Sequence, residues 1–110
     1  MVIEDDAIVA MVVEEILLDM GLQVLTTSTL ESALADIEIA SFDAAIVDMH
    51  LRGDSAAPVT RALLARKTPF IVLSGLDQSE FTARHPQIKA LIKPFEKAVL
   101  ERAVRDMLSP

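Results

Sequence analysis

The stretch Ala44-Ala45-Ile46-Val47-Asp48 decides how this chain folds. Four consecutive apolar residues, followed by a polar segment at residues 50–55, are typical of a strand that is buried on both faces of a sheet. The carboxylate of Asp48 then stands at the C-terminal tip of that strand. Open α/β sheets place their ligand sites at the carboxyl ends of strands, so Asp48 is the first candidate functional residue.

Three further apolar runs also end in a chemically active side chain. An acidic pair, a hydroxyl and an ammonium at neighbouring strand tips are the groups that a magnesium-dependent, phosphoryl-accepting aspartate requires. Glu4 and Asp5 follow residues 1–3, Ser74 follows residues 70–73, and Lys93 follows residues 90–92.

The segments between these runs have the periodicity of helices. Asp6 is placed to cap a helix that ends before Gly21, and Ser28 with Glu31 form a possible capping box for the next helix. Strands are expected at residues 1–3, 23–27, 44–47, 70–73 and 90–92. Three helices are expected at about residues 6–20, 28–40 and 58–66. A fourth helix, capped by Asp77 or Glu80, has room for only two turns before Pro86, and the last helix begins at Glu96 or Lys97.

Strict alternation of strands and helices predicts a parallel sheet covered on both faces. Right-handed crossovers then give an α/β, flavodoxin-like, doubly wound (βα)5 fold with five parallel strands in the order 2-1-3-4-5. The order reverses between the first and third strands. Glu4, Asp5 and Asp48 follow these two strands, so the topology predicts that the three carboxylates share one crevice.

Bulk composition sets the class of protein. A length of 110 residues indicates a single domain over residues 1–110, and no run approaches the roughly 18 apolar residues of a membrane span. The chain has no cysteine, which excludes disulfides and thiol catalysis, and its formal charge of −7 argues against direct nucleic-acid binding. Acids already at position 4 do not fit a secretory signal, so a cytoplasmic protein without membrane contact is expected.

Three carboxylates in one crevice need a cation or a proton. Two unit charges about 4 Å apart repel by about 4 kcal/mol at an effective dielectric constant of about 20. Carboxylate oxygens favour Mg²⁺, which keeps several waters and takes one or two protein carboxylates directly. We therefore expect Asp5 and Asp48 to bind Mg²⁺ directly and Glu4 to bind it through water. Lys93 and Ser74 would support phosphoryl oxygens around Asp48.

Four motifs in this order resemble the receiver domain of response regulators in two-component signalling. The resemblance covers essentially the whole chain and rests on Val2-Ile3-Glu4-Asp5-Asp6, Ile46-Val47-Asp48, Val72-Leu73-Ser74-Gly75 and Lys93-Pro94-Phe95.

The resemblance implies that Asp48 is the phosphoacceptor, Ser74 the switch hydroxyl and Lys93 the conserved-type lysine, and that the backbone carbonyl of His50 completes the metal site. It also implies a histidine kinase or phosphotransfer protein as partner, an effector that the sequence does not name, and a monomer or weak homodimer. The stretch from Asp48 to Phe70 further resembles small alphaproteobacterial receivers associated with HWE-type histidine kinases.

The chain departs from the receiver pattern at several positions. Ala90 stands where receivers often carry a switching Tyr or Phe, and Arg52 replaces a common loop proline. The fourth helix is also short. We expect the Lys93-Pro94 peptide bond to be cis, because a tight turn has to aim the ammonium back at the site.

Three alternatives remain open. Asp48, His50 and Gly53 satisfy the D-x-H-x-x-G pattern of cobalamin-binding domains, but that interpretation leaves the acidic pair and Lys93 unexplained. A haloacid-dehalogenase-type phosphatase would need an acid where His50 stands. A degenerate receiver that acts only as a phosphorylation-independent binding module is the stronger rival, although no expected site position is missing.

Overall fold

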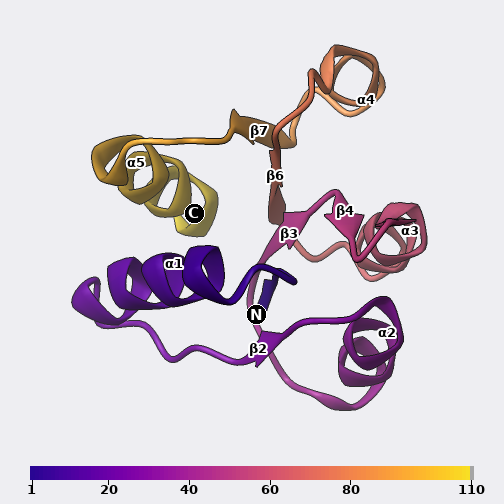
Figure 1. The fold of residues 1–110 in the computed structure, drawn as a ribbon, viewed down its shortest axis with the longest axis horizontal. Coiled ribbons are helices and arrows are strands. Elements are labelled where there is room, and N and C mark those ends of the chain that lie inside the picture. The colour runs from indigo at the N-terminus through magenta and orange to yellow at the C-terminus, as the bar shows by residue number, and fades with distance from the viewer. Residues whose placement is uncertain (110) are drawn as a thin grey trace.

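The computed structural model describes residues 1–109 and shows a five-stranded parallel sheet between two layers of helices (Figure 1). The sheet has the order β2-β1-β3-β6-β7, which is the predicted order 2-1-3-4-5 once a separate two-strand hairpin is left out. The strands are β1 (Val2–Ile3), β2 (Thr26–Thr27), β3 (Ala45–Asp48), β6 (Phe70–Ser74) and β7 (Lys89–Ile92), and the hairpin is β4 (His50–Leu51) with β5 (Asp54–Ser55).

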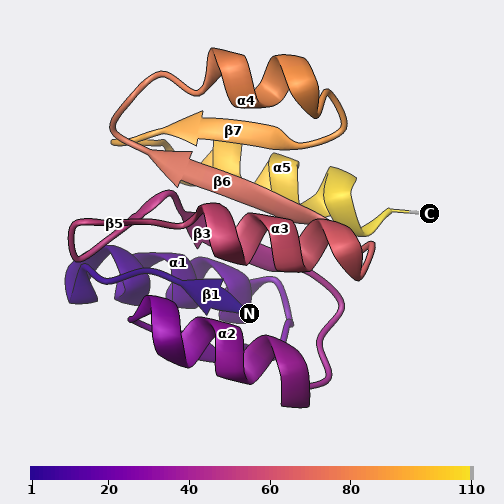
Figure 2. The same cartoon turned by 90° about the vertical axis from the view of Figure 1, so that its right-hand side faces the viewer.

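Five helices connect the strands. Helices α1 and α5 lie on one face of the sheet, and α2 and α3 lie on the other, with α4 beyond β7 on that side (Figures 1 and 2). No helix among the described residues is long and apolar enough to cross a membrane. The helices are α1 (Ala7–Asp19), α2 (Leu30–Ile39), α3 (Ala57–Ala65), α4 (Ser79–Arg84) and α5 (Lys97–Leu108).

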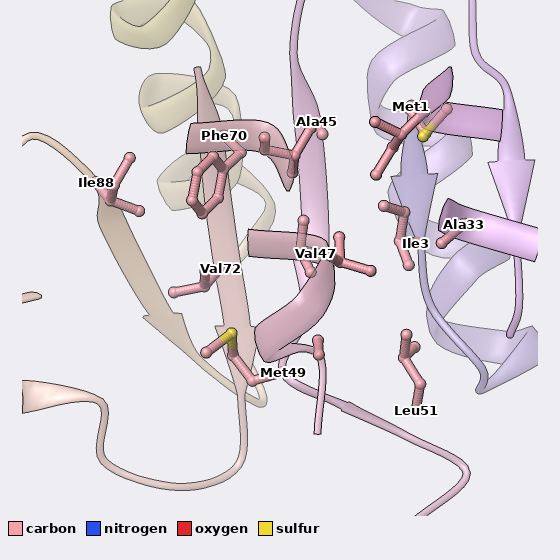
Figure 3. Close-up of a cluster of buried hydrophobic side chains, with 14 residues drawn as sticks. Met1, Ile3, Ala33, Ala45, Val47, Met49, Leu51, Phe70, Val72 and Ile88 are labelled. Atoms are coloured by element: carbon pink, nitrogen blue, oxygen red, sulfur yellow. The ribbon is translucent and has the colours of Figure 1, made fainter. Parts of the chain in front are cut away.

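Alternation along the strands divides the core into two layers. Successive strand residues point to opposite faces, so Ile3 and Val47 pack toward α2 and α3, whereas Val2 and Ile46 pack toward α1 and α5. Figure 3 shows the first layer, in which Phe70 is the fully buried aromatic residue, while Phe42 and Phe81 pack against the layer and are only partly buried. Both layers are aliphatic, as the low aromatic content predicts, and they hold the strand tips in a fixed register.

Local sequence rules explain how α1 starts and stops. The side chain of Asp6 accepts hydrogen bonds from the backbone N–H groups of Ile8 and Val9, so Asp6 is the predicted N-cap. Gly21 follows the helix with a φ of 82°, the left-handed conformation expected of a glycine just past a helix end. This firm start positions the acids immediately before α1.

Three sequence-based expectations for the fold are wrong. The side chain that caps α2 belongs to Thr29, which accepts from the Ser32 N–H at 3.1 Å, and not to Ser28. Neither Asp77 nor Glu80 caps α4: its N-cap residue is Gln78, without a side-chain capping bond, and Asp77 instead accepts from the Ser79 N–H. Strand β2 covers only residues 26–27 of the expected 23–27, since its partner β1 has only two residues.

Candidate functional site

The tips of β1 and β3 bring the three predicted acids together. Because Val2 pairs with Ile46 and Ile3 with Val47, the residues that follow the two strands lie side by side. One carboxylate oxygen from each of Glu4, Asp5 and Asp48 lies within 4.8 Å of the others. The crevice predicted from the order of the strands is therefore present.

Each carboxylate in this crevice accepts a hydrogen bond from a backbone N–H group. The Asp6 N–H donates to Oε2 of Glu4 at 3.2 Å, the His50 N–H to Oδ1 of Asp48 at 3.1 Å, and the Arg52 N–H to Oδ2 of Asp5 at 2.9 Å. Backbone donors orient the acids without adding a competing side-chain charge.

Lys93 supplies the positive charge opposite two of the acids. Its Nζ lies 2.6 Å from Oε1 of Glu4 and 3.2 Å from Oδ2 of Asp48. The buried Oε1 of Glu4 is therefore paired with the ammonium of Lys93 and has no other donor among the described residues. The Lys93-Pro94 bond is cis, as expected.

Ser74 ends β6 and is buried next to these groups in the sheet. Its Oγ accepts from the Leu76 N–H at 3.0 Å and from Nε2 of Gln78 at 3.2 Å. The Lys93 N–H donates to the Ser74 carbonyl at 2.9 Å, so the backbones at the β6 and β7 tips are joined. The hydroxyl thus lies one strand away from Asp48 and is held by the loop that leads to α4.

Burial and crowding shift the protonation of the cluster. Desolvation raises the pKa of Glu4 to about 7, and its contact with Asp48 adds to the rise, while Lys93 and the Asp6 N–H only partly offset it. Desolvation also acts to raise the pKa of Asp5, but the Arg52 N–H and bonds with the neighbouring acids outweigh it, and the net shift is downward.

The ammonium responds in the opposite way to its surroundings. Burial alone would lower the pKa of Lys93, but Glu4 and Asp48 raise it above its ordinary value. Lys93 therefore stays charged at neutral pH. With one cation facing three carboxylates, the cluster still favours a further positive charge, either a proton on Glu4 or a metal ion.

The donor set fits Mg²⁺. Three hard carboxylate groups, with one oxygen of each converging within 4.8 Å, are suitable for a small divalent cation. The His50 side chain is exposed, and its backbone stands two residues after Asp48 in β4. The roles of these residues are taken up as proposals below.

Two contacts at the site were missed from sequence. Arg52 and Gly53 have φ values of 51° and 85° and form the tight turn between β4 and β5, which presents the Arg52 N–H to Asp5. The glycine at position 53 was the available sequence signal for this turn, but position 52 lacks the Asn or Asp that usually precedes such a glycine. Gln78 contacts Ser74 four residues along the chain, and no pattern in the sequence indicated this bond.

One cavity of the structure lies away from this site. It measures about 570 Å³ and lies at the opposite end of the sheet, between the loop before β2, the loop before β3 and the end of α5. Its lining mixes polar and apolar groups and includes Leu22, Phe42 and Asp43. The three acids of the site are not part of the lining of this cavity.

Comparisons with known proteins agree with the fold. A family model described as the response regulator receiver domain matches residues 1–105, and the chain therefore belongs to this family. A search of curated proteins found no match. Membership in this family identifies the chain as a domain of two-component signalling. The alternative of a cobalamin-binding domain is left without support.

Solved structures of receivers resemble the chain over nearly its full length. The receiver domain of a sensor histidine kinase from Pseudomonas aeruginosa, which has a magnesium ion coordinated in its active site cleft, is 25% identical, with 96% of this chain and 93% of that chain covered and a TM-score of 0.80. SdrG from Sphingomonas melonis is 31% identical, with 98% and 93% covered and a TM-score of 0.81. The BeF3-activated conformation of SdrG is 34% identical, with the same coverage and a TM-score of 0.78.

Proposed function

We propose that Asp48 accepts a phosphoryl group from a histidine kinase or a phosphotransfer protein in a Mg²⁺-dependent reaction, and that the domain then changes conformation. The observation that carries this proposal is the convergence of three carboxylates within 4.8 Å, two of which contact the Lys93 ammonium. The whole chain acts as one receiver domain, although Pro110 lies outside the described residues. A cytoplasmic location is part of the same proposal.

Asp5 and Asp48 would hold Mg²⁺ directly, Glu4 would hold it through water, and the His50 backbone carbonyl would complete the protein ligands. When bound, the ion would neutralise charge on the phosphoryl oxygens during transfer. The Mg²⁺-bound receiver domain from Pseudomonas aeruginosa supports this assignment at the level of the family. For this chain, the assignment is supported by the excess of negative charge at the site, where three carboxylates are accompanied by the single ammonium of Lys93.

The residues of the chain prepare Asp48 as the nucleophile. One oxygen of its carboxylate accepts from the His50 N–H and the other contacts Nζ of Lys93, so the side chain is held in one orientation. An Asp48 oxygen attacks phosphorus, the bond from phosphorus to the donor nitrogen or oxygen breaks, and the donor leaves with that electron pair. Lys93 then neutralises a phosphoryl oxygen, and the Ser74 hydroxyl donates to another.

The surface beside the site suits a protein partner. Helix α1 starts directly after the acidic pair and is apolar almost all around, although a helix of this kind normally lies buried. Its outer face exposes Ile8 at 73%, Met11 at 58% and Leu18 at 51%. A phosphoryl-donating protein that docked on this face would bury it and bring its phosphohistidine to Asp48. Association with HWE-type kinases stays a prediction.

The conformational response is assigned to the loop after Ser74. Ala90 pairs with Val72 within the sheet and has no ring that could move between two positions. The change is therefore carried by Ser74 and the loop at residues 75–79. The alternative, a degenerate receiver that binds partners without phosphorylation, is less favoured because every expected site group is present at the strand tips.

Intact-mass spectrometry after incubation with acetyl phosphate tests the proposal. We expect one phosphoryl adduct on the wild type with Mg²⁺, none with EDTA, and none on Asp48→Asn. Asp106→Asn is the matched control, because it removes an exposed carboxylate from α5 and should keep the adduct. An equal adduct on Asp48→Asn would place the phosphoryl group elsewhere. A wild type that stays unmodified with Mg²⁺ would favour the degenerate receiver.

A further inference from the structure

The hydrogen bonds of Ser74 leave a single direction for its proton. A hydroxyl has two acceptor positions and one donor. Oγ of Ser74 accepts from the Leu76 N–H and from Nε2 of Gln78, so both acceptor positions are filled. Its O–H is then the one remaining group that can form a bond. The Gln78 amide thus constrains the direction in which the hydroxyl donates.

Gln78 also belongs to the start of α4. It is the N-cap residue of that helix, and its carbonyl accepts from the N–H and the hydroxyl of Thr82 at 3.0 and 3.2 Å. Among residues 1–109, the bond from Gln78 to Ser74 is the one side-chain hydrogen bond that joins the first turn of α4 to a strand tip. Any displacement of the hydroxyl is therefore passed to this turn.

We propose that Gln78 is a positioning residue: its amide orients the Ser74 hydroxyl toward a phosphoryl group on Asp48 and couples that hydroxyl to α4. The inference rests on the proposed function, because it requires a phosphoryl group at Asp48. It goes beyond that function by naming the side chain through which the strand tip moves the helix. Gln78 touches neither Asp48 nor Lys93 and acts only through Ser74.

The packing of α4 allows it to follow such a displacement. The helix has six residues, none of them buried, and it lacks a side-chain cap. A groove of about 370 Å³ separates it from α3 and is lined by Gln78, Phe81 and Leu64 among others. Phe81 lies against His85 with ring centroids 4.8 Å apart and against the buried Phe70 at 6.4 Å, so this one side chain links the helix to the core.

Backbone NMR at saturating beryllofluoride and Mg²⁺ measures the coupling. The variant Gln78→Glu keeps the shape of the side chain but removes the donor, and its carboxylate can accept the Ser74 proton in competition with the phosphoryl mimic. One neutral hydrogen bond shifts a two-state equilibrium by roughly fivefold. We expect the amide shifts of residues 79–84 on adding beryllofluoride to fall, by at most about this factor, because the shift follows the population of the active state. Gln87→Glu, an exposed glutamine in the turn after α4, is the matched control and should respond as the wild type does.

A double-mutant cycle separates positioning from a general effect on α4. In a Ser74→Ala background, which blunts the response itself, Gln78→Glu should cause no further loss, because Gln78 acts through the absent hydroxyl. An additional loss in that background, or a full response of the single variant Gln78→Glu, overturns the inference. If Gln78→Glu does not fold, the same measurements are made on Gln78→Leu, which also lacks the amide donor.

The outcomes also separate this inference from the proposed function. A wild type without an Asp48 adduct from acetyl phosphate contradicts the proposed function itself. A wild type that is phosphorylated and whose α4 response is independent of Gln78 contradicts only the role of Gln78.

Discussion

Helices α1 and α4 both begin a few residues after a strand tip that carries site residues, yet they are held very differently. Helix α1 has thirteen residues, a side-chain cap from Asp6 and three buried side chains. Helix α4 has six residues, no side-chain cap and no buried side chain. The acids that face a cation are thus attached to a firm element, and the switch hydroxyl is attached to a lightly held one. This contrast suggests that the acidic site at the start of α1 stays fixed and that α4 is the element that moves on phosphorylation.

The largest expected effect concerns core packing under the two helices. Ile16→Ala in α1 removes a buried side chain and should lower the free energy of unfolding by about 2–5 kcal/mol. Thr82→Ala in α4 removes only a half-buried one and should lower it by less than about 1 kcal/mol. Urea unfolding followed by circular dichroism measures both, since the chain has no Trp or Tyr. Equal losses would remove the contrast between the helices.

The acidic tip before α1 should make stability depend on pH. The pKa of Glu4 is about 7 in the folded chain and ordinarily 4.5, so between these values the folded state binds more protons than the unfolded state. The contribution of Glu4 is complete below about pH 4.5 and is lost as the pH rises to about 7. In magnesium-free buffer, Glu4→Gln should therefore flatten the decline in unfolding free energy across this window.

Glu80→Gln is the control for this pH dependence, because it removes an exposed carboxylate from the first turn of α4. Its pH profile should follow that of the wild type. A profile of Glu4→Gln that declines as steeply as the wild type would show that the charge of Glu4 is not disfavoured in the fold.

Magnesium titration compares the two acids of the pair. A group that acts on a metal through an outer shell typically contributes 10–100-fold, as an order of magnitude, to metal affinity. We expect Glu4→Ala to fall in about this range and Asp5→Ala, the proposed direct ligand, to weaken Mg²⁺ binding further. Calorimetry measures both, with Asp77→Ala in the loop before α4 as a control that retains affinity. A larger loss for Glu4→Ala would reverse the two assignments.

The smallest expected effect concerns the helix starts. Asp6→Ala removes two capping hydrogen bonds from α1 and should lower the free energy of unfolding by about 1 kcal/mol. Asp77→Ala, which loses only local bonds to Ser79, should change it by less than about 0.5 kcal/mol. Denaturation in metal-free buffer avoids any contribution from cation binding. If the two values coincide, the caps do not distinguish the helices.

Much of the fold was predictable because periodicity and strand-tip chemistry agreed with each other. The runs ending at Asp48 and Ser74 are apolar enough to be strands buried on both faces, and the alternation with helices fixes the strand order. That order alone brings Glu4, Asp5 and Asp48 together. The site was therefore predictable to the level of which residues meet.

The details that could not be predicted depend on choices between nearly equivalent local bonds. Ser28 and Thr29 both offer a hydroxyl, and only the path of the chain decides that Thr29 reaches the Ser32 N–H. In the hairpin β4–β5, Arg52 has the left-handed backbone conformation. L-residues other than Asn or Asp rarely adopt this conformation, so sequence rules favoured an open loop. The bond from Gln78 to Ser74 depends on loop geometry that no periodic pattern encodes.

The turn at Arg52 has a consequence for which sequences the site tolerates. Asp5 is oriented by the main chain of Arg52 and not by its guanidinium. The guanidinium is therefore not needed for this contact, but the residue has to adopt positive φ, which Asn and Gly do readily. A change to Asn or Gly at position 52 would thus remove the positive charge beside the site and keep the backbone bond that orients Asp5.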